Sequence, residues 1–74
     1  MTSNTKARAA VSAEVRAQMG RYNKRQRELA EVLGISQPQV SARLRGDVAW
    51  SVDDLATIAQ WLGISPADLI GDAA

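Results

Sequence analysis

The sequence has neither cysteine nor histidine among its 74 residues. The chain therefore cannot form a disulfide or a thiolate metal site, and it lacks the usual zinc ligands, thiol nucleophile and general base. Aromatic residues are also scarce, with two Trp, one Tyr and no Phe. These absences argue against an enzyme, and we expect no catalytic residues, no metal, no cofactor and no small-molecule ligand.

Long hydrophobic runs are missing as well. No stretch approaches the ~18 apolar residues of a membrane helix, and the first residues lack the apolar run of a secretory signal. We therefore expect no membrane association and a cytoplasmic location. A chain of this length has room for one domain with one core, and its many Ala, Leu, Val and Ile residues suit short, closely packed helices.

The charges are sorted along the chain, although the net charge is only +1. Residues 1–27 carry seven basic side chains against one acidic one, whereas residues 47–74 carry five aspartates and no basic residue. Such a dipolar chain can present one basic face to a polyanion such as nucleic acid. The alternative is a solvated surface whose charges happen to be sorted.

Apolar residues recur with the period of an α-helix. Val11, Val15 and Met19 mark the inner side of a first helix, and Ala7 and Tyr22 extend it. Similar stripes further along consist of Leu29, Val32, Leu33, Val40, Leu44, Val52, Leu55, Ile58, Ala59 and Leu62. We predict an all-α fold with five helices at about residues 7–22, 25–33, 37–45, 52–62 and 66–70, preceded by a loose arm at 1–6 and followed by a short tail at 72–74.

Three of these helices start with a capping box, in which two side chains satisfy free backbone N–H groups. The pairs are Ser36 with Gln39, Ser51 with Asp54, and Ser65 with Asp68. The tetrapeptide Leu-Gly-Ile-Ser at 33–36 recurs at 62–65. We interpret it as two sharp corners in which Gly adopts a positive φ, Ile enters the core and Ser starts the next helix.

Residues 26–45 form the unit that points to function. Ala30 is small where two helices cross, and Gly34 permits a tight turn between them. The arrangement predicts a helix-turn-helix, which holds its second helix rigidly enough to enter a DNA groove.

The stretch 26–37, Gln-Arg-Glu-Leu-Ala-Glu-Val-Leu-Gly-Ile-Ser-Gln, resembles the second helix and turn of the lambda-type phage repressor and Cro family. Val40-Ser41 and the Leu44-x-Gly46 that follows look like its recognition helix, and residues 55–69 are similar to its fourth and fifth helices. The resemblance covers about residues 8–71. It implies a five-helix, lambda-repressor-like domain that binds double-stranded DNA sequence-specifically and regulates transcription.

Base contacts are expected from helix 37–45. When its apolar side chains face inward, a helical wheel places Pro38, Ala42 and Arg45 on the outer face and Ser41 at its flank. Gln37 lies at the tip, and the resemblance puts Gln37, Pro38 and Ala42 on base-reading positions. Gln pairs bidentately with adenine, Arg with guanine, and apolar side chains contact the thymine methyl group.

Phosphate contacts are expected around the start of helix 25–33. The resemblance gives Gln26 a grip on the backbone, and Lys24, Arg25 and Arg27 surround it. Arg43 stands where the family usually has an apolar residue, and we interpret it as a further phosphate contact. In the arm, Lys6 and Arg8 are expected to reach a neighbouring groove.

A homodimer on DNA is also expected, because family members usually bind paired half-sites. We predict its contact patch at Trp61, Leu69 and Ile70, with Trp61 either exposed in an interface or covered by the first helix or the tail. The alternative functions are an antitoxin that binds operator DNA and a partner protein, and a module that bridges proteins without binding DNA.

Overall fold

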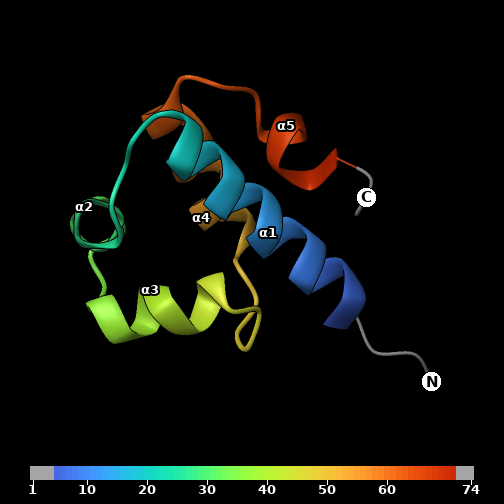
Figure 1. Cartoon of the computed structure of the whole chain (residues 1–74), viewed down its shortest axis with the longest axis horizontal. Coiled ribbons are helices and arrows are strands. Elements are labelled where there is room, and N and C mark those ends of the chain that lie inside the picture. The colour runs from blue at the N-terminus through green and yellow to red at the C-terminus, as the bar shows by residue number, and fades with distance from the viewer. Residues whose placement is uncertain (1–4, 72–74) are drawn as a thin grey trace.

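The computed structural model describes residues 5–71, and within that range every regular element is a helix. Figure 1 shows five of them: α1 (Thr5–Arg21), α2 (Gln26–Leu33), α3 (Gln37–Leu44), α4 (Val52–Leu62) and α5 (Pro66–Ile70). The predicted all-α fold with five helices is confirmed. None of these helices combines the length and apolar content needed to cross a bilayer.

The first helix begins earlier than the sequence pattern predicts. Thr5 is its first residue, so Lys6 and Arg8 belong to α1 rather than to a loose arm or its junction. The remainder of the expected arm, residues 1–4, and the expected tail, residues 72–74, lie outside the described part of the chain. Asn23 follows α1 with a φ of 57°, as expected for a residue that ends a helix.

The three predicted capping boxes are all present. The hydroxyl groups of Ser36 and Ser51 accept the N–H of the residue three positions later, and that of Ser65 accepts the Ala67 N–H. In return, the side chains of Gln39, Asp54 and Asp68 accept the backbone N–H of the three serines. These bonds fix where α3, α4 and α5 begin.

The repeated Leu-Gly-Ile-Ser segments form two corners with nearly the same backbone. Gly34 has φ 70° and ψ 31°, and Gly63 has φ 73° and ψ 31°. In each corner the following Ile donates its N–H to a carbonyl five residues back, Ile35 to Ala30 and Ile64 to Ala59. The fold therefore uses the same turn to join α2 to α3 and α4 to α5.

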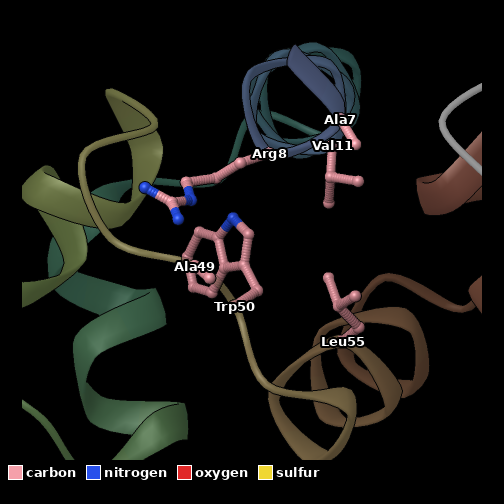
Figure 2. A pocket seen from close by; sticks show the side chains of 6 residues that line it. All are labelled: Ala7, Arg8, Val11, Ala49, Trp50 and Leu55. Atoms are coloured by element: carbon pink, nitrogen blue, oxygen red, sulfur yellow. The ribbon is translucent and has the colours of Figure 1, made fainter. Parts of the chain in front are cut away.

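The connection between α3 and α4 contains a buried aromatic residue, Trp50, whose role the sequence pattern does not predict. Trp50 is only 9% exposed and forms one wall of a shallow apolar groove (Figure 2). Val11 of α1 and Leu55 of α4 line the same groove. The indole nitrogen points at α1 and donates to the Ser12 hydroxyl at 3.2 Å. The connection is thereby anchored to the first helix.

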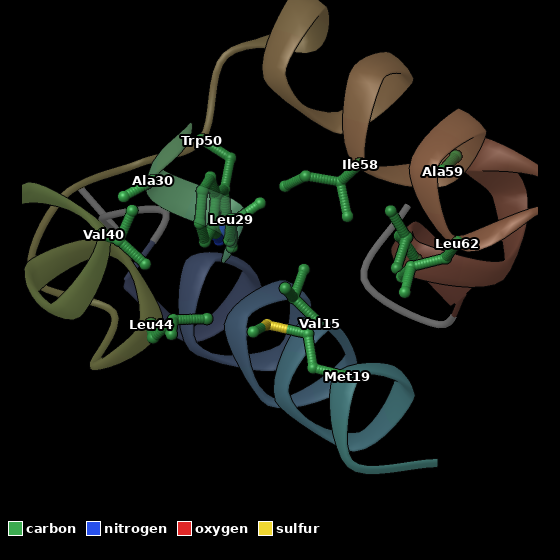
Figure 3. Close-up of a cluster of buried hydrophobic side chains, with 11 residues drawn as sticks. Val15, Met19, Leu29, Ala30, Val40, Leu44, Trp50, Ile58, Ala59 and Leu62 are labelled. Carbon is green, nitrogen blue, oxygen red and sulfur yellow. The ribbon is translucent and has the colours of Figure 1, made fainter. Parts of the chain in front are cut away.

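The hydrophobic core lies where the five helices converge (Figure 3). Each helix contributes one apolar side chain with no exposed surface: Val15, Leu29, Val40, Ile58 and Leu69. Burial of each such side chain stabilises the fold by about 1.5–3 kcal/mol. Since no helix supplies the core alone, the position of α3 depends on all the others.

Three residues assigned to the inner stripes are at the surface instead. Val52 is 83% exposed, Tyr22 41% and Val32 39%. Val52 is the first residue of α4, and Trp50 two positions earlier occupies the core there. Conversely, Ser12 is polar yet completely buried, because it bonds both the Trp50 indole and a carbonyl of α3.

Candidate nucleic-acid interface

The helix predicted to read bases, α3, lies at the margin of the domain (Figure 1). Val40 and Leu44 are buried against the body, whereas Pro38 and Arg45 are exposed and Ser41 and Ala42 half-buried. With about 100° per residue, the last four fall on one contiguous side of the helix. The structure therefore brings the predicted base-contacting residues of α3 together on one outward side.

The two glutamines at the start of α3 differ in what holds them. The Gln39 side chain accepts the Ser36 N–H at 2.9 Å, so capping accounts for it. Gln37 is exposed, and its side chain makes no hydrogen bond to any other residue in the range 5–71. Its side-chain carbonyl oxygen and NH2 group therefore both remain available to an external partner.

The start of α2 lacks the cap that the later helices have. Its N-cap is Arg25, whose side chain has no acceptor atom. The Arg25 N–H donates to the Glu28 carboxylate at 2.8 Å, but its own side chain caps none of the N–H groups of the first turn. Free N–H groups and the helix dipole favour an anion at such an end, and the exposed Arg25 and Arg27 add positive charge.

A groove beside this helix start gathers further basic residues. Its polar lining consists of Arg16, Lys24, Arg25 and Gln26, and Leu44 of α3 also lines it. Arg16 was not among the predicted contacts, although it belongs to the basic block at 1–27. The sequence could not show this, because Arg16 comes near the others only through the packing of α1 against α3 and the position of the connection between α1 and α2.

Lys24 is held by the segment that joins α1 to α2. Its N–H donates to the Met19 carbonyl at 2.7 Å, and its ammonium lies 5.4 Å from the centre of the Trp61 ring. A cation over the face of an indole ring is attracted to it. Trp61 is half-buried and has this cation over it, so the start of α2 and the end of α4 are connected.

Arg43 does not belong to the open side of α3. Its guanidinium donates to the Gln39 carbonyl at 3.1 Å and lies 4.0 Å from the Asp54 carboxylate, and its side chain is only 20% exposed. The guanidinium therefore lies beside α4, and the phosphate contact expected of Arg43 stays a prediction. The helical period of α3 carries no information about Asp54, which comes from another helix.

The C-terminal end of α3 is tied to α1. The Ser12 hydroxyl donates to the Arg43 carbonyl at 2.5 Å, Arg16 donates to the Leu44 carbonyl, and Arg8 donates to the Asp47 carbonyl at 3.4 Å. Carbonyls at a helix end lack intrahelical partners, and cations there are favoured by the dipole. Arg8 thus has a structural contact that the sequence did not predict, whereas Lys6 is exposed.

The predicted dimer patch is not a continuous exposed surface. Leu69 is completely buried in the core, and Ile70 and Trp61 are half-buried. Leu69 is therefore unavailable to a partner. The sequence alone could not show this, because α5 is too short for its periodicity to distinguish an inner from an outer side.

Comparison with known proteins gives one family. The chain matches the BetR domain over residues 6–74, which include all five helices except the first residue of α1. No curated protein and no solved structure matches it. The match agrees with a helix-turn-helix whose outer helix and neighbouring basic residues face outward. The chain therefore belongs to the BetR domain family, a family of DNA-binding regulatory domains.

Proposed function

We propose that this protein is a sequence-specific regulator of transcription that reads the major groove of double-stranded DNA with residues 37–45, in the manner of a phage Cro protein or a compact repressor. The observation that carries the proposal is the exposed side of α3, with Gln37 at its tip making no side-chain hydrogen bond within residues 5–71. An exposed helix of this kind, held at both ends, fits the major groove of B-DNA.

The side chains of α3 favour a sparse readout. Gln37 is suited to adenine and Arg45 to guanine, each pair contributing about 1–3 kcal/mol of discrimination. Pro38 and Ala42 have no polar side-chain atoms and are suited to thymine methyl groups or to groove shape. Ser41 lies beside them with one hydroxyl, which already accepts a hydrogen bond from Arg45.

Backbone contacts are proposed at the start of α2. The uncapped N–H groups lie near Gln26, Lys24, Arg25 and Arg27. Arg16 lines the groove beside this helix start. Such contacts set the position of a protein on DNA without reading its sequence. Arg43 is proposed as a further phosphate contact, on the side of α3 that lies next to Asp54.

The regulator is proposed to act as a homodimer on DNA. A single module of this size offers few base contacts, and two copies on half-sites about one helical turn apart double them. It is also proposed to act by binding alone, without catalysis or a cofactor. The carboxylates that could suggest acid–base chemistry, Asp54 and Asp68, instead accept the N–H groups of Ser51 and Ser65.

The test is affinity selection of random duplex DNA by the purified protein at two salt concentrations. The expected result is a palindromic motif with half-sites about one turn apart. Binding without any motif that collapses as salt rises would mean backbone attraction alone. That result would reject the proposal and move the antitoxin and bridging alternatives ahead.

A variant then tests the role of α3. Gln37→Ala is expected to relax the base preference at one position of each half-site and to leave the others unchanged. Gln60→Ala is the matched control, because Gln60 is an exposed glutamine on α4. Equal weakening on all sequences would exclude Gln37 as a base reader.

A further inference from the structure

Arg45 is held between two polar side chains at the end of α3. Its Nη1 donates to the Ser41 hydroxyl at 2.9 Å, and its Nε donates to the Asp47 carboxylate at 2.9 Å. Neither bond uses Nη2. Both Nη2 protons and one Nη1 proton are not used by these two bonds, so the guanidinium keeps donors for a bidentate acceptor.

The position of Asp47 is itself fixed. Its N–H donates to the Ala42 carbonyl at 3.0 Å, and its carbonyl accepts a hydrogen bond from Arg8 at 3.4 Å. The preceding Gly46 has a φ of 86° and its N–H donates to the Arg43 carbonyl at 3.0 Å. The Asp47 carboxylate is therefore attached to a backbone segment that bonds to both α3 and α1.

We propose that Asp47 and Ser41 are positioning residues that hold Arg45 ready to read a guanine. The inference rests on the proposed function, because it assigns Arg45 to the base-reading side of α3. Guanine presents O6 and N7 to the major groove, a pair of acceptors that matches the open edge of the Arg45 guanidinium. Asp47 contacts no base in this arrangement and acts only through Arg45.

The expected effect follows from the cost of immobilising a long side chain. The side chains of Arg45 and Asp47 are each 60% exposed, so solvent screens their attraction and the pair adds little stability. Its contribution is to orientation, because a side chain that is ordered before binding loses less freedom on binding. Loss of this ordering should reduce guanine discrimination by about two- to tenfold.

The experiment uses the full chain and the operator recovered by selection, with each base pair of a half-site replaced in turn. Asp47→Asn is expected to reduce the preference for one G·C pair, the same pair at which Arg45→Ala loses its preference. Asp53→Asn is the matched control, because it removes the same charge from an exposed position in the first turn of α4. Asp53→Asn should leave every base preference unchanged.

A double-mutant cycle separates positioning from charge. In the Arg45→Ala background, Asp47→Asn should no longer change the preference at that base pair, because its effect passes through Arg45. An equal rise in affinity for all sequences, with the preference intact, would overturn the proposal and leave Asp47 as a simple repulsive charge. If the wild-type chain selects no motif, the proposed function fails with it. A motif unaffected both by Asp47→Asn and by Asp47→Ala, which removes the acceptor as well as the charge, refutes this inference alone.

Discussion

The substitution Ser12→Ala tests whether buried hydrogen bonds fix the end of α3. Ser12 has no exposed surface, donates to the Arg43 carbonyl and accepts the Trp50 indole N–H. The alanine variant keeps the Cβ and removes only the hydroxyl. The Arg43 carbonyl still accepts the Gly46 N–H, so the main loss falls on the indole, whose N–H has no other hydrogen bond among residues 5–71.

The size of the expected stability loss follows from the one hydrogen bond that is lost. A buried donor left without a partner costs about 1–3 kcal/mol, whereas alanine is preferred over serine in a helix by about 0.5 kcal/mol. We expect the free energy of unfolding to fall by about 0.5–2.5 kcal/mol, the difference between these two terms. Urea unfolding followed by circular dichroism measures it. Ala13→Ser, at the neighbouring exposed position of α1, measures the difference in helix propensity between the two residues on its own. Its effect has the opposite sign, because alanine is replaced by serine.

A cycle with Trp50→Phe identifies the bond that carries the loss. Phenylalanine has no N–H, so no donor is left unsatisfied when Ser12 is replaced in that background. The cost of Ser12→Ala should therefore shrink by more than half there. A cost below 0.5 kcal/mol in the wild-type background, or an equal cost in both backgrounds, contradicts the argument; the threshold is about the spread of ordinary surface substitutions.

Three further outcomes follow from single features. Lys24→Ala should reduce the slope of log affinity for DNA against log salt by about 1, because one phosphate contact is lost; titrations at four salt concentrations measure it. Gly34→Ala should lower the free energy of unfolding by about 1–2 kcal/mol through its positive φ alone, since no other side chain or backbone atom is found within 4 Å of the added Cβ. In urea unfolding, Gly34→Asn should lose less stability than Gly34→Ala, because Asn tolerates this φ better. Asp54→Ala should cost about 1 kcal/mol through the lost cap, while Asp53→Ala should stay within about 0.5 kcal/mol.

The parts of the fold that could be predicted depend on neighbours in sequence. A capping box joins residues three positions apart, and a glycine corner joins residues five positions apart. Ser51 with Asp54 and the Gly63 turn can therefore be predicted from their own segments. The core positions Val15 and Ile58 follow from helical period in the same way. These signals locate the helices and their inner sides.

The parts that could not be predicted depend on distant partners. Ser12 and Trp50 are 38 residues apart, and neither stands out locally. A serine within an apolar stripe suggests an exposed position unless its partner is known, and a Trp in a short connection has no period to place it. Arg16 joins the basic groove for the same reason, through contacts between α1, α2 and α3.

The two ends of α3 are therefore fixed by different means. Its start depends on a local box, Ser36 with Gln39, whereas its end depends on tethers from Arg8, Ser12 and Arg16 of α1. The residues of α3 determine which bases it can contact. The hydrogen bonds from α1 help to set the angle between α3 and the DNA groove. A small misplacement of a contacting group weakens recognition sharply. Grafting α3 onto a related protein should therefore transfer its base preference only when the first helix of that protein makes equivalent hydrogen bonds to the end of α3.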